Sequence, residues 1–174
     1  PTAKEYQLIT TVNNQPELFN GIIRPTRTVS ISAIDLTAEN TSSNLLMALS
    51  NNEDIKELNI YAERFYVKDT FNFPQTKVNI YCKELYFQNV SGHAPAVINT
   101  TSEKLPAALE RAPGLKGATA GTINIFANKI IDDNGGIRFR LIGGDGQNST
   151  NAQAGDGGDG GRLFSNIDLF YKGD

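Results

Sequence analysis

Few residues of this chain have the types and the spacing that catalysis requires. His93 is the one histidine, and it lies in the loop-like sequence SGHAPA without a flanking strand or elbow motif. A Ser–His–acid site would need a serine and a carboxylate brought to His93 from distant segments. Cys82 is the one cysteine, and it takes a position held by Ala62 and Ala127 in similar segments, which predicts a small inward-facing side chain. We therefore predict no catalytic residue and no enzyme.

Acidic and basic side chains come closest to forming a binding constellation between residues 132 and 140. Asp132 and Asp133 precede Arg138 and Arg140, which we expect on the outward face of a strand within 135–144. Such a set could bind an acidic sugar. Adjacent aspartates point in different directions, however, and no second carboxylate has the spacing that acid–base catalysis of glycoside cleavage needs. Arg138 and Arg140 are retained as candidate ligand-binding residues.

A glycine-rich stretch, GGDGQNSTNAQAGDGGDGG, occupies residues 143–161 and raises the question of a metal site. Its aspartates, Asp145, Asp156 and Asp159, are candidate Ca²⁺ ligands together with loop carbonyls. The stretch fails the calcium-repeat rule G-G-x-G-x-D-x-U-x, because Asn148 stands where the rule needs aspartate. The phosphate-loop motif is also absent. Solvated loop aspartates are the favoured interpretation, and no cofactor is predicted.

The same stretch has a period of three. Every third residue from Gly143 to Gly161 is small, and Gly114, Gly117 and Ala120 in the preceding loop have the same spacing. A small residue at every third position is typical of a polyproline II helix with one crowded face. Two interpretations remain open: helices of this kind packed side by side, or a mobile surface loop.

An internal repeat organises most of the chain. ELNIYAERFYVKD (57–69), KVNIYCKELYFQN (77–89) and TINIFANKIIDDN (122–134) are similar, and weaker copies cover 28–40 and 164–174. Each copy alternates apolar and other residues, breaks phase by two residues, and alternates again. Alternation with a period of two predicts strands, and the break predicts a corner between two short strands.

Stacked copies would form ladders of equivalent side chains. Asparagines and aromatic residues would stack on the outward face, and Glu63 would meet Lys83 at the corner, as Arg64 would meet Glu84. An exposed aromatic row is a platform for sugar rings or for a partner chain, unless the N-terminal segment covers it. The candidate ligand-binding residues of this face are Asn59, Asn79, Asn124, Tyr61, Tyr81 and Phe126.

These patterns predict an all-β fold, a right-handed parallel β-helix or solenoid, with an antiparallel β-sandwich as the alternative. Residues 1–56 would form an N-terminal cap segment with a short helix at 43–50, capped by Ser42 or Ser43. Residues 57–174 would form the coils, with long loops at 91–121 and 143–161, and the whole would be one folded unit.

The net charge and the distribution of apolar residues argue against two kinds of partner. The formal net charge of −3 argues against nucleic acid, and no apolar run has the length of a membrane span. The chain begins at Pro1, so we expect a piece of a longer protein with further domains.

The repeated NIYA…FYV, NIYC…LYF and NIFA…II unit resembles parallel β-helix proteins of secreted or surface-exposed bacterial type. The glycine-rich stretch is similar to polyproline II regions of phage tail-tip adhesins and of an insect antifreeze protein. The resemblance implies an extracellular or cell-surface location and a non-enzymatic module for adhesion, carbohydrate contact or assembly, with a glycan or protein partner. The alternatives are a carbohydrate-active β-helix enzyme fragment, of polysaccharide lyase or glycoside hydrolase type, and a structural or receptor-binding piece of a secreted toxin.

Overall fold

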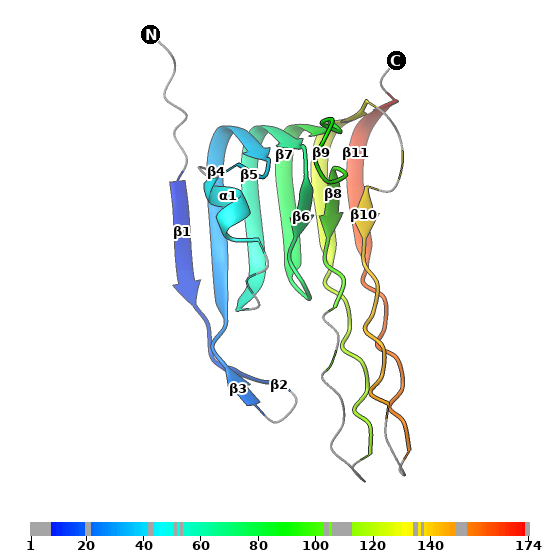
Figure 1. Cartoon of the computed structure of the whole chain (residues 1–174). Coiled ribbons are helices and arrows are strands. Elements are labelled where there is room, and N and C mark those ends of the chain that lie inside the picture. The colour runs from blue at the N-terminus through cyan, green and yellow to red at the C-terminus, as the bar shows by residue number, and fades with distance from the viewer. Residues whose placement is uncertain are drawn as a thin grey trace.

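β-strands are the main secondary structure of the protein, and its one described helix is short, as a computed structural model of the chain shows (Figure 1). The structure describes residues 8–19, 22–41, 44–50, 52, 54–102, 105, 113–133, 136, 138–148 and 153–172. Within these residues, no helix has the length and apolar character needed to cross a membrane. The prediction of an all-β fold is confirmed.

Two sheets face each other across the core. The larger sheet has the order β1-β4-β5-β7-β9-β11, and the smaller has the order β10-β8-β6. The strands of the larger sheet are β1 (Leu8–Asn13), β4 (Arg27–Ala38), β5 (Ile55–Val67), β7 (Lys77–Phe87), β9 (Ile123–Asp132) and β11 (Leu163–Lys172). The smaller sheet contains β6 (Thr70–Asn72), β8 (Val97–Asn99) and β10 (Phe139–Arg140), and β2 (Glu17–Phe19) and β3 (Ile22–Arg24) form a separate hairpin.

From β5 to β11 the chain alternates between the two sheets, so successive strands of the larger sheet are neighbours and run parallel. Asn59 pairs with Asn79 and Asn79 with Asn124, which confirms the register expected from the repeat. The antiparallel alternative is wrong for these strands. The weak copy at 28–40 is β4, in which Ser30 pairs with Asn59, so the parallel stack begins one repeat before residue 57.

The phase break lies within one continuous strand. The parallel pairing of β5 with β7 skips Glu63 and Lys83 and then resumes at Arg64 and Glu84. The predicted corner between two separate strands is therefore wrong: the strands bend over at this end without ending (Figure 1). The Lys83 ammonium group bonds the Glu63 carboxylate at 2.6 Å, as expected. Arg64 lies opposite Glu84 but makes its ion pair with Asp35 on β4.

The core lies between the sheets and consists of ladders of like residues. Ile31, Ile60, Ile80 and Ile125 are paired in register on consecutive strands, and none is exposed to solvent. Aromatic residues fill the space toward the smaller sheet, where Phe65 and Phe71 meet edge to face at 5.8 Å between ring centroids; Phe73 and Phe87 are also fully buried. Each such side chain stabilises the fold by about 1.5–3 kcal/mol on burial.

A short helix, α1 (Leu45–Ala48), precedes β5 on the side of the larger sheet where β6 lies (Figure 1). Its N-cap is Asn44, whose side-chain oxygen accepts the Met47 N–H at 3.1 Å, so the prediction of a serine cap is wrong. Asn44 also donates to the Thr37 carbonyl and so fixes the helix to β4. Ser42 and Ser43 lie outside the described residues.

The helix covers the first edge of the smaller sheet. Leu46 is buried in the core, and the chain then makes a turn to Ser50. The Ser50 hydroxyl donates to the Asn72 carbonyl at 3.0 Å and accepts the Asn72 N–H at 3.2 Å. These two bonds satisfy backbone groups that the edge strand β6 would otherwise present unpaired.

Three glycine-rich segments, residues 113–121, 141–147 and 153–161, extend together beyond the sheets (Figure 1). The first segment donates N–H groups to the third, the third to the second, and the second to the first. The bonds between the first and third segments show the spacing: Gly114, Gly117 and Ala120 donate to the carbonyls of Gln153, Asp156 and Asp159. Every third residue thus faces another segment. We call these three segments the glycine bundle.

The closest contacts between the segments require glycine. A Cβ atom on Gly158 would lie 2.1 Å from the Ala118 oxygen, and one on Gly117 would lie 2.0 Å from the Gly144 oxygen. Real Cβ atoms do not approach other atoms so closely. The period of three therefore marks packed polyproline II helices, which decides between the two interpretations left open by the sequence. Ser149 and Ala152 lie outside the described residues.

Candidate functional site

The outward face of the larger sheet carries a row of stacked aromatic rings. The ring centroids of Tyr61 and Tyr81 are 5.1 Å apart, and those of Tyr81 and Phe126 are 4.8 Å apart, with the planes within 7° of parallel. Tyr61 is 44% exposed and Tyr81 is 37% exposed. Phe164 on β11 continues the row at 5.7 Å with a tilted ring. The structure thus brings the three predicted aromatic residues together.

Stacking decides which part of each ring a ligand can reach. Tyr61, Tyr81 and Phe126 lie face to face in sequence, so the middle ring, Tyr81, presents its edge to solvent. A sugar ring that packs on an aromatic side chain needs a free face. Tyr81 is stacked on both sides, whereas Tyr61 is stacked on one side. The free face of Tyr61 is directed toward β4, where Ser32 is its partner in register.

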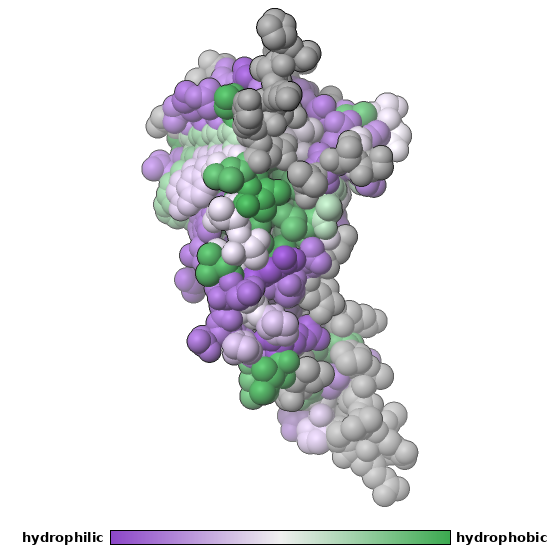
Figure 2. Space-filling view, turned by 90° about the vertical axis from the view of Figure 1, so that its left-hand side faces the viewer, coloured by the Kyte–Doolittle hydropathy of each residue, from purple (hydrophilic) through white to green (hydrophobic). Residues whose placement is uncertain are grey.

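Small side chains lie between the free face of Tyr61 and β1. The residues of β4 that pair with the outward positions of β1 and β5 are small, namely Ser30 and Ser32. The next strand outward is β1, on which Leu8 pairs with Ser32 and is 64% exposed. Seen from the β1 side, apolar residues form a patch at mid-height of the molecule (Figure 2). We call the strip over Ser30 and Ser32, between Leu8 and Tyr61, the serine channel.

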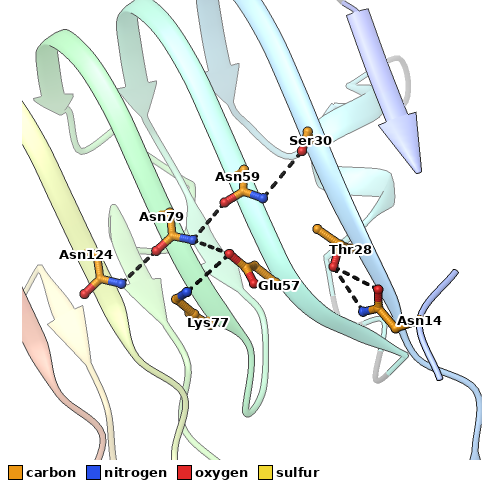
Figure 3. A network of polar contacts seen from close by, with 8 residues as sticks. All are labelled: Asn14, Thr28, Ser30, Glu57, Asn59, Lys77, Asn79 and Asn124. Carbon is orange, nitrogen blue, oxygen red and sulfur yellow. Dashed lines mark hydrogen bonds and ion pairs between the residues drawn. The ribbon is translucent and has the colours of Figure 1, made fainter. Parts of the chain in front are cut away.

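The predicted asparagines form a hydrogen-bonded ladder beside the rings (Figure 3). Asn124 donates to Asn79 at 2.7 Å, Asn79 donates to Asn59 at 2.8 Å, and Asn59 donates to the Ser30 hydroxyl at 3.5 Å. Asn79 also donates to Glu57 and is only 4% exposed. The amides therefore hold the strands in register, and the end of the ladder at Ser30 brings it to the serine channel.

A second pair of stacked rings lies beyond the bend. The centroids of Tyr66 and Tyr86 are 4.6 Å apart, and the two rings are stacked. The Tyr86 hydroxyl donates to the Glu84 carboxylate, and this hydrogen bond, together with burial, raises the pKa of Tyr86 to about 12. The Tyr86 phenol is therefore uncharged at neutral pH.

The structure separates the two candidate arginines from the aromatic row and buries only Arg138. Arg138 is 7% exposed, so its prediction as an outward-facing residue is wrong. It forms a two-point ion pair with Asp132, donates to Asn89 at 3.0 Å, and packs over the Phe87 ring. Burial of Arg138 reflects the shortness of β10, which begins only at Phe139 and does not impose strand alternation on the preceding residue.

Arg140 is exposed on the smaller sheet. It is remote in the fold from the outward face of the larger sheet, so it does not share a site with the aromatic row. The predicted strand over 135–144 reduces to β10.

The candidate metal ligands are exposed on the glycine bundle. Asp145, Asp156 and Asp159 lie at the surface, and Asp159 pairs with Lys116 at 3.4 Å. Among the described residues, no group of three or more His, Cys, Asp or Glu side chains converges as a metal site requires. Backbone hydrogen bonds join the described segments of the bundle to one another.

The remaining reactive side chains have structural partners. Cys82 is buried at the position of Ala62 and Ala127, and burial raises the pKa of its thiol to about 12. His93 bonds the buried Asp69 at 3.0 Å. Burial by itself raises the pKa of Asp69, but hydrogen bonds from the Asn40 N–H and from His93 outweigh burial and hold that pKa below its ordinary value.

Sequence reasoning missed the serine channel. Its signal is present in the weak repeat copy at 28–40, where Ser30 and Ser32 replace the asparagine and aromatic residue of the stronger copies. A comparison of the chain with models of known protein families finds no match, and comparisons with curated proteins and with solved structures find none either.

Proposed function

We propose that this chain is a non-enzymatic module of a larger extracellular protein and contacts carbohydrate through the serine channel. The observation that carries the proposal is the free ring face of Tyr61 above small hydroxyl side chains. A pyranose ring packs its C–H groups against such a face, while its hydroxyl groups need polar partners. Ser30 and Ser32 supply those partners, and Leu8 forms the opposite apolar wall.

We further propose that the two sheets are the coils of a right-handed parallel β-helix. Support comes from the order of the strands, since β5, β6 and β7 follow one another across the two sheets with β5 parallel to β7. Crossovers between parallel strands of one sheet are right-handed in nearly all proteins. Figure 1 is consistent with this hand, because the chain rises in the larger sheet behind and descends in β6 in front.

A role in assembly within a parent protein fits the open end of the stack. Within the described chain β11 pairs only with β9, and its Leu163 and Phe164 are about half exposed. An unpaired parallel edge with exposed apolar side chains is a surface that further coils or a partner would cover.

The alternative that the chain is a fragment of a carbohydrate-active enzyme has less support. The constellation that suggested it included Asp132 and Arg138, which are buried and bonded to each other. A carboxylate held in a buried ion pair is not available to transfer a proton to a glycosidic oxygen.

The proposal is tested by screening the wild-type protein against neutral oligosaccharides and measuring the affinity of a bound one by calorimetry. Tyr61→Ala removes the ring face, and about 0.5–1.5 kcal/mol of aromatic packing corresponds to up to about a tenfold loss of affinity. Tyr61→Phe keeps the face and is the matched control, with affinity expected near wild type. If Tyr61→Ala binds as well as Tyr61→Phe and the wild type, the carbohydrate contact lies elsewhere. Release of reducing sugar ends would overturn the non-enzymatic assignment.

A further inference from the structure

A groove lies at the end of the molecule where the glycine bundle leaves the sheets. Its walls are the β2–β3 hairpin on one side and residues 116–120 of the bundle on the other, with the start of β5 and the β6–β7 turn as its base. Its volume is about 490 Å³, within the range of small-ligand sites. We call it the hairpin groove. It is formed by different residues from the serine channel.

The hairpin groove is positively charged in a chain whose net charge is −3. Arg24, Lys56 and Lys116 line it, and Glu17 is the one carboxylate among its described lining residues. Lys56 pairs with Glu17 at 2.5 Å, and both side chains are about half exposed. Lys116 reaches Asp159 at 3.4 Å, and this pair is more exposed still. Exposed ion pairs are weak, so both lysines can turn to an anionic ligand at little cost.

The bundle wall adds hydrogen-bonding groups. Gly117 and Ala120 use their N–H groups within the bundle, as the period of three requires. The N–H groups of Ala118 and Thr119 make no hydrogen bond within the described chain, because two of every three residues of such a helix face outward. The groove therefore combines cations with polar backbone on a wall that the packed glycines hold rigid.

The chemistry of the lining selects the class of ligand. An acidic peptide would need pockets for its side chains, but the apolar lining consists of small or buried groups such as Ile55, Pro74 and Ala118. None of the described residues that line the groove is aromatic, so they offer a nucleotide base nothing to stack on. A ligand with many hydroxyl groups can hydrogen-bond the polar backbone of the bundle wall, Thr119 and Gln75. Negative charges on the same ligand would meet the three cations. We propose that the hairpin groove binds an acidic saccharide, carrying carboxylate or sulfate groups.

Calorimetric titration with three hexasaccharides tests the proposal: a heparin-derived one, an oligogalacturonate, and neutral maltohexaose. We expect the wild-type protein to bind at least one acidic hexasaccharide, with affinity falling as salt rises, and to bind maltohexaose at least tenfold more weakly at this site. Binding of the heparin probe alone assigns sulfate as the recognised group, and binding of both assigns any anion.

The double variant Lys56→Gln, Lys116→Gln should lose at least tenfold in affinity for the acidic probe. Lys83→Gln removes an exposed, ion-paired lysine from the far end of the sheets and should change the affinity less than twofold. Thermal melts check that all variants fold, which the exposure of these side chains predicts. Tyr61→Ala should leave acidic binding unchanged, so failure of the serine channel and failure of the groove are told apart.

The groove assignment is overturned if the wild-type protein binds neither acidic hexasaccharide. It is equally overturned if the double variant binds as well as wild type, if Lys83→Gln loses as much, or if Tyr61→Ala abolishes acidic binding. Tighter binding of hexaglutamate than of both acidic saccharides would replace the saccharide by a peptide.

Discussion

Two neighbouring glycines of the bundle should respond in opposite ways to the same substitution. A Cβ atom on Gly158 would lie 2.1 Å from the Ala118 oxygen and 2.7 Å from the Gly117 oxygen. On Gly157 the nearest atom, the Gly144 oxygen, would be 3.9 Å away, which is ordinary contact. Gly157→Ala is therefore the matched control for Gly158→Ala, since both remove the same chain freedom from the unfolded state.

The magnitude follows from the bonds that must move. Relief of the Gly158→Ala contact requires the first and third segments to separate by roughly 1 Å, since contacts below about 3 Å are not tolerated. That shift breaks the Gly117 N–H bond to Asp156 and the Ala120 N–H bond to Asp159, now 2.7 and 3.1 Å long. At about 1 kcal/mol each, plus lost packing, the variant should be destabilised by about 2–3 kcal/mol. Gly157→Ala should gain about 0.4–1 kcal/mol.

Amide hydrogen exchange is the appropriate assay, because the bundle can open without unfolding of the sheets. Protection of the Gly117, Gly144 and Gly158 amides should fall about 30-fold or more in Gly158→Ala and stay or rise in Gly157→Ala. Amides of the buried strand at Ile80 serve as the internal reference. Equal protection of the bundle amides in the two variants would refute the packed polyproline II interpretation.

Three further predictions concern the buried polar side chains Arg138, Asn79 and Asp69. Arg138→Met removes the ion pair of the buried Asp132 carboxylate and should lower the free energy of unfolding by about 3–5 kcal/mol in urea titration, whereas Arg140→Met should change it by less than about 0.5 kcal/mol. Similar values for both would contradict the burial of Arg138. Asn79→Ala removes three hydrogen bonds and Asn124→Ala removes one, so the first should cost about 2–3 kcal/mol and the second about 1, and the reverse order would disprove the ladder. The pKa of Asp69 is lowered in the folded state, so its stabilisation is complete above the unfolded pKa of about 3.9 and is lost as pH falls through the folded pKa. Asp69→Asn should therefore be less stable than wild type at pH 7, with a difference that shrinks below about pH 4; a difference independent of pH would be the contrary result.

The sequence was most informative where side chains stack on copies of themselves. Asn59 and Asn79 sit 20 residues apart because one turn of the chain brings equivalent backbone positions into register, and the repeat reveals that spacing directly. The small residue at every third position likewise predicted the bundle, since only a polyproline II helix places such residues on one face.

Features that depend on unequal repeats were beyond prediction. Strand alternation placed Arg138 outward, but Asp132 at the end of β9 and Phe87 and Asn89 at the end of β7 enclose it. The hairpin groove likewise joins Arg24, Lys56 and Lys116, which no motif connects. Sequence periodicity predicts the contacts that repeat between neighbouring strands. It gives no information on contacts that occur only once.

Nuclear magnetic resonance mapping of a bound neutral oligosaccharide tests the central claim most directly. Backbone and side-chain resonances would be followed during titration of the wild-type protein with the best ligand from the oligosaccharide screen. If carbohydrate binds at the serine channel, the largest chemical-shift changes should occur at Leu8, Ser30, Ser32 and Tyr61. Phe126 should be little affected. Shifts centred on Phe126, or no saturable shift at the serine channel, would contradict the claim.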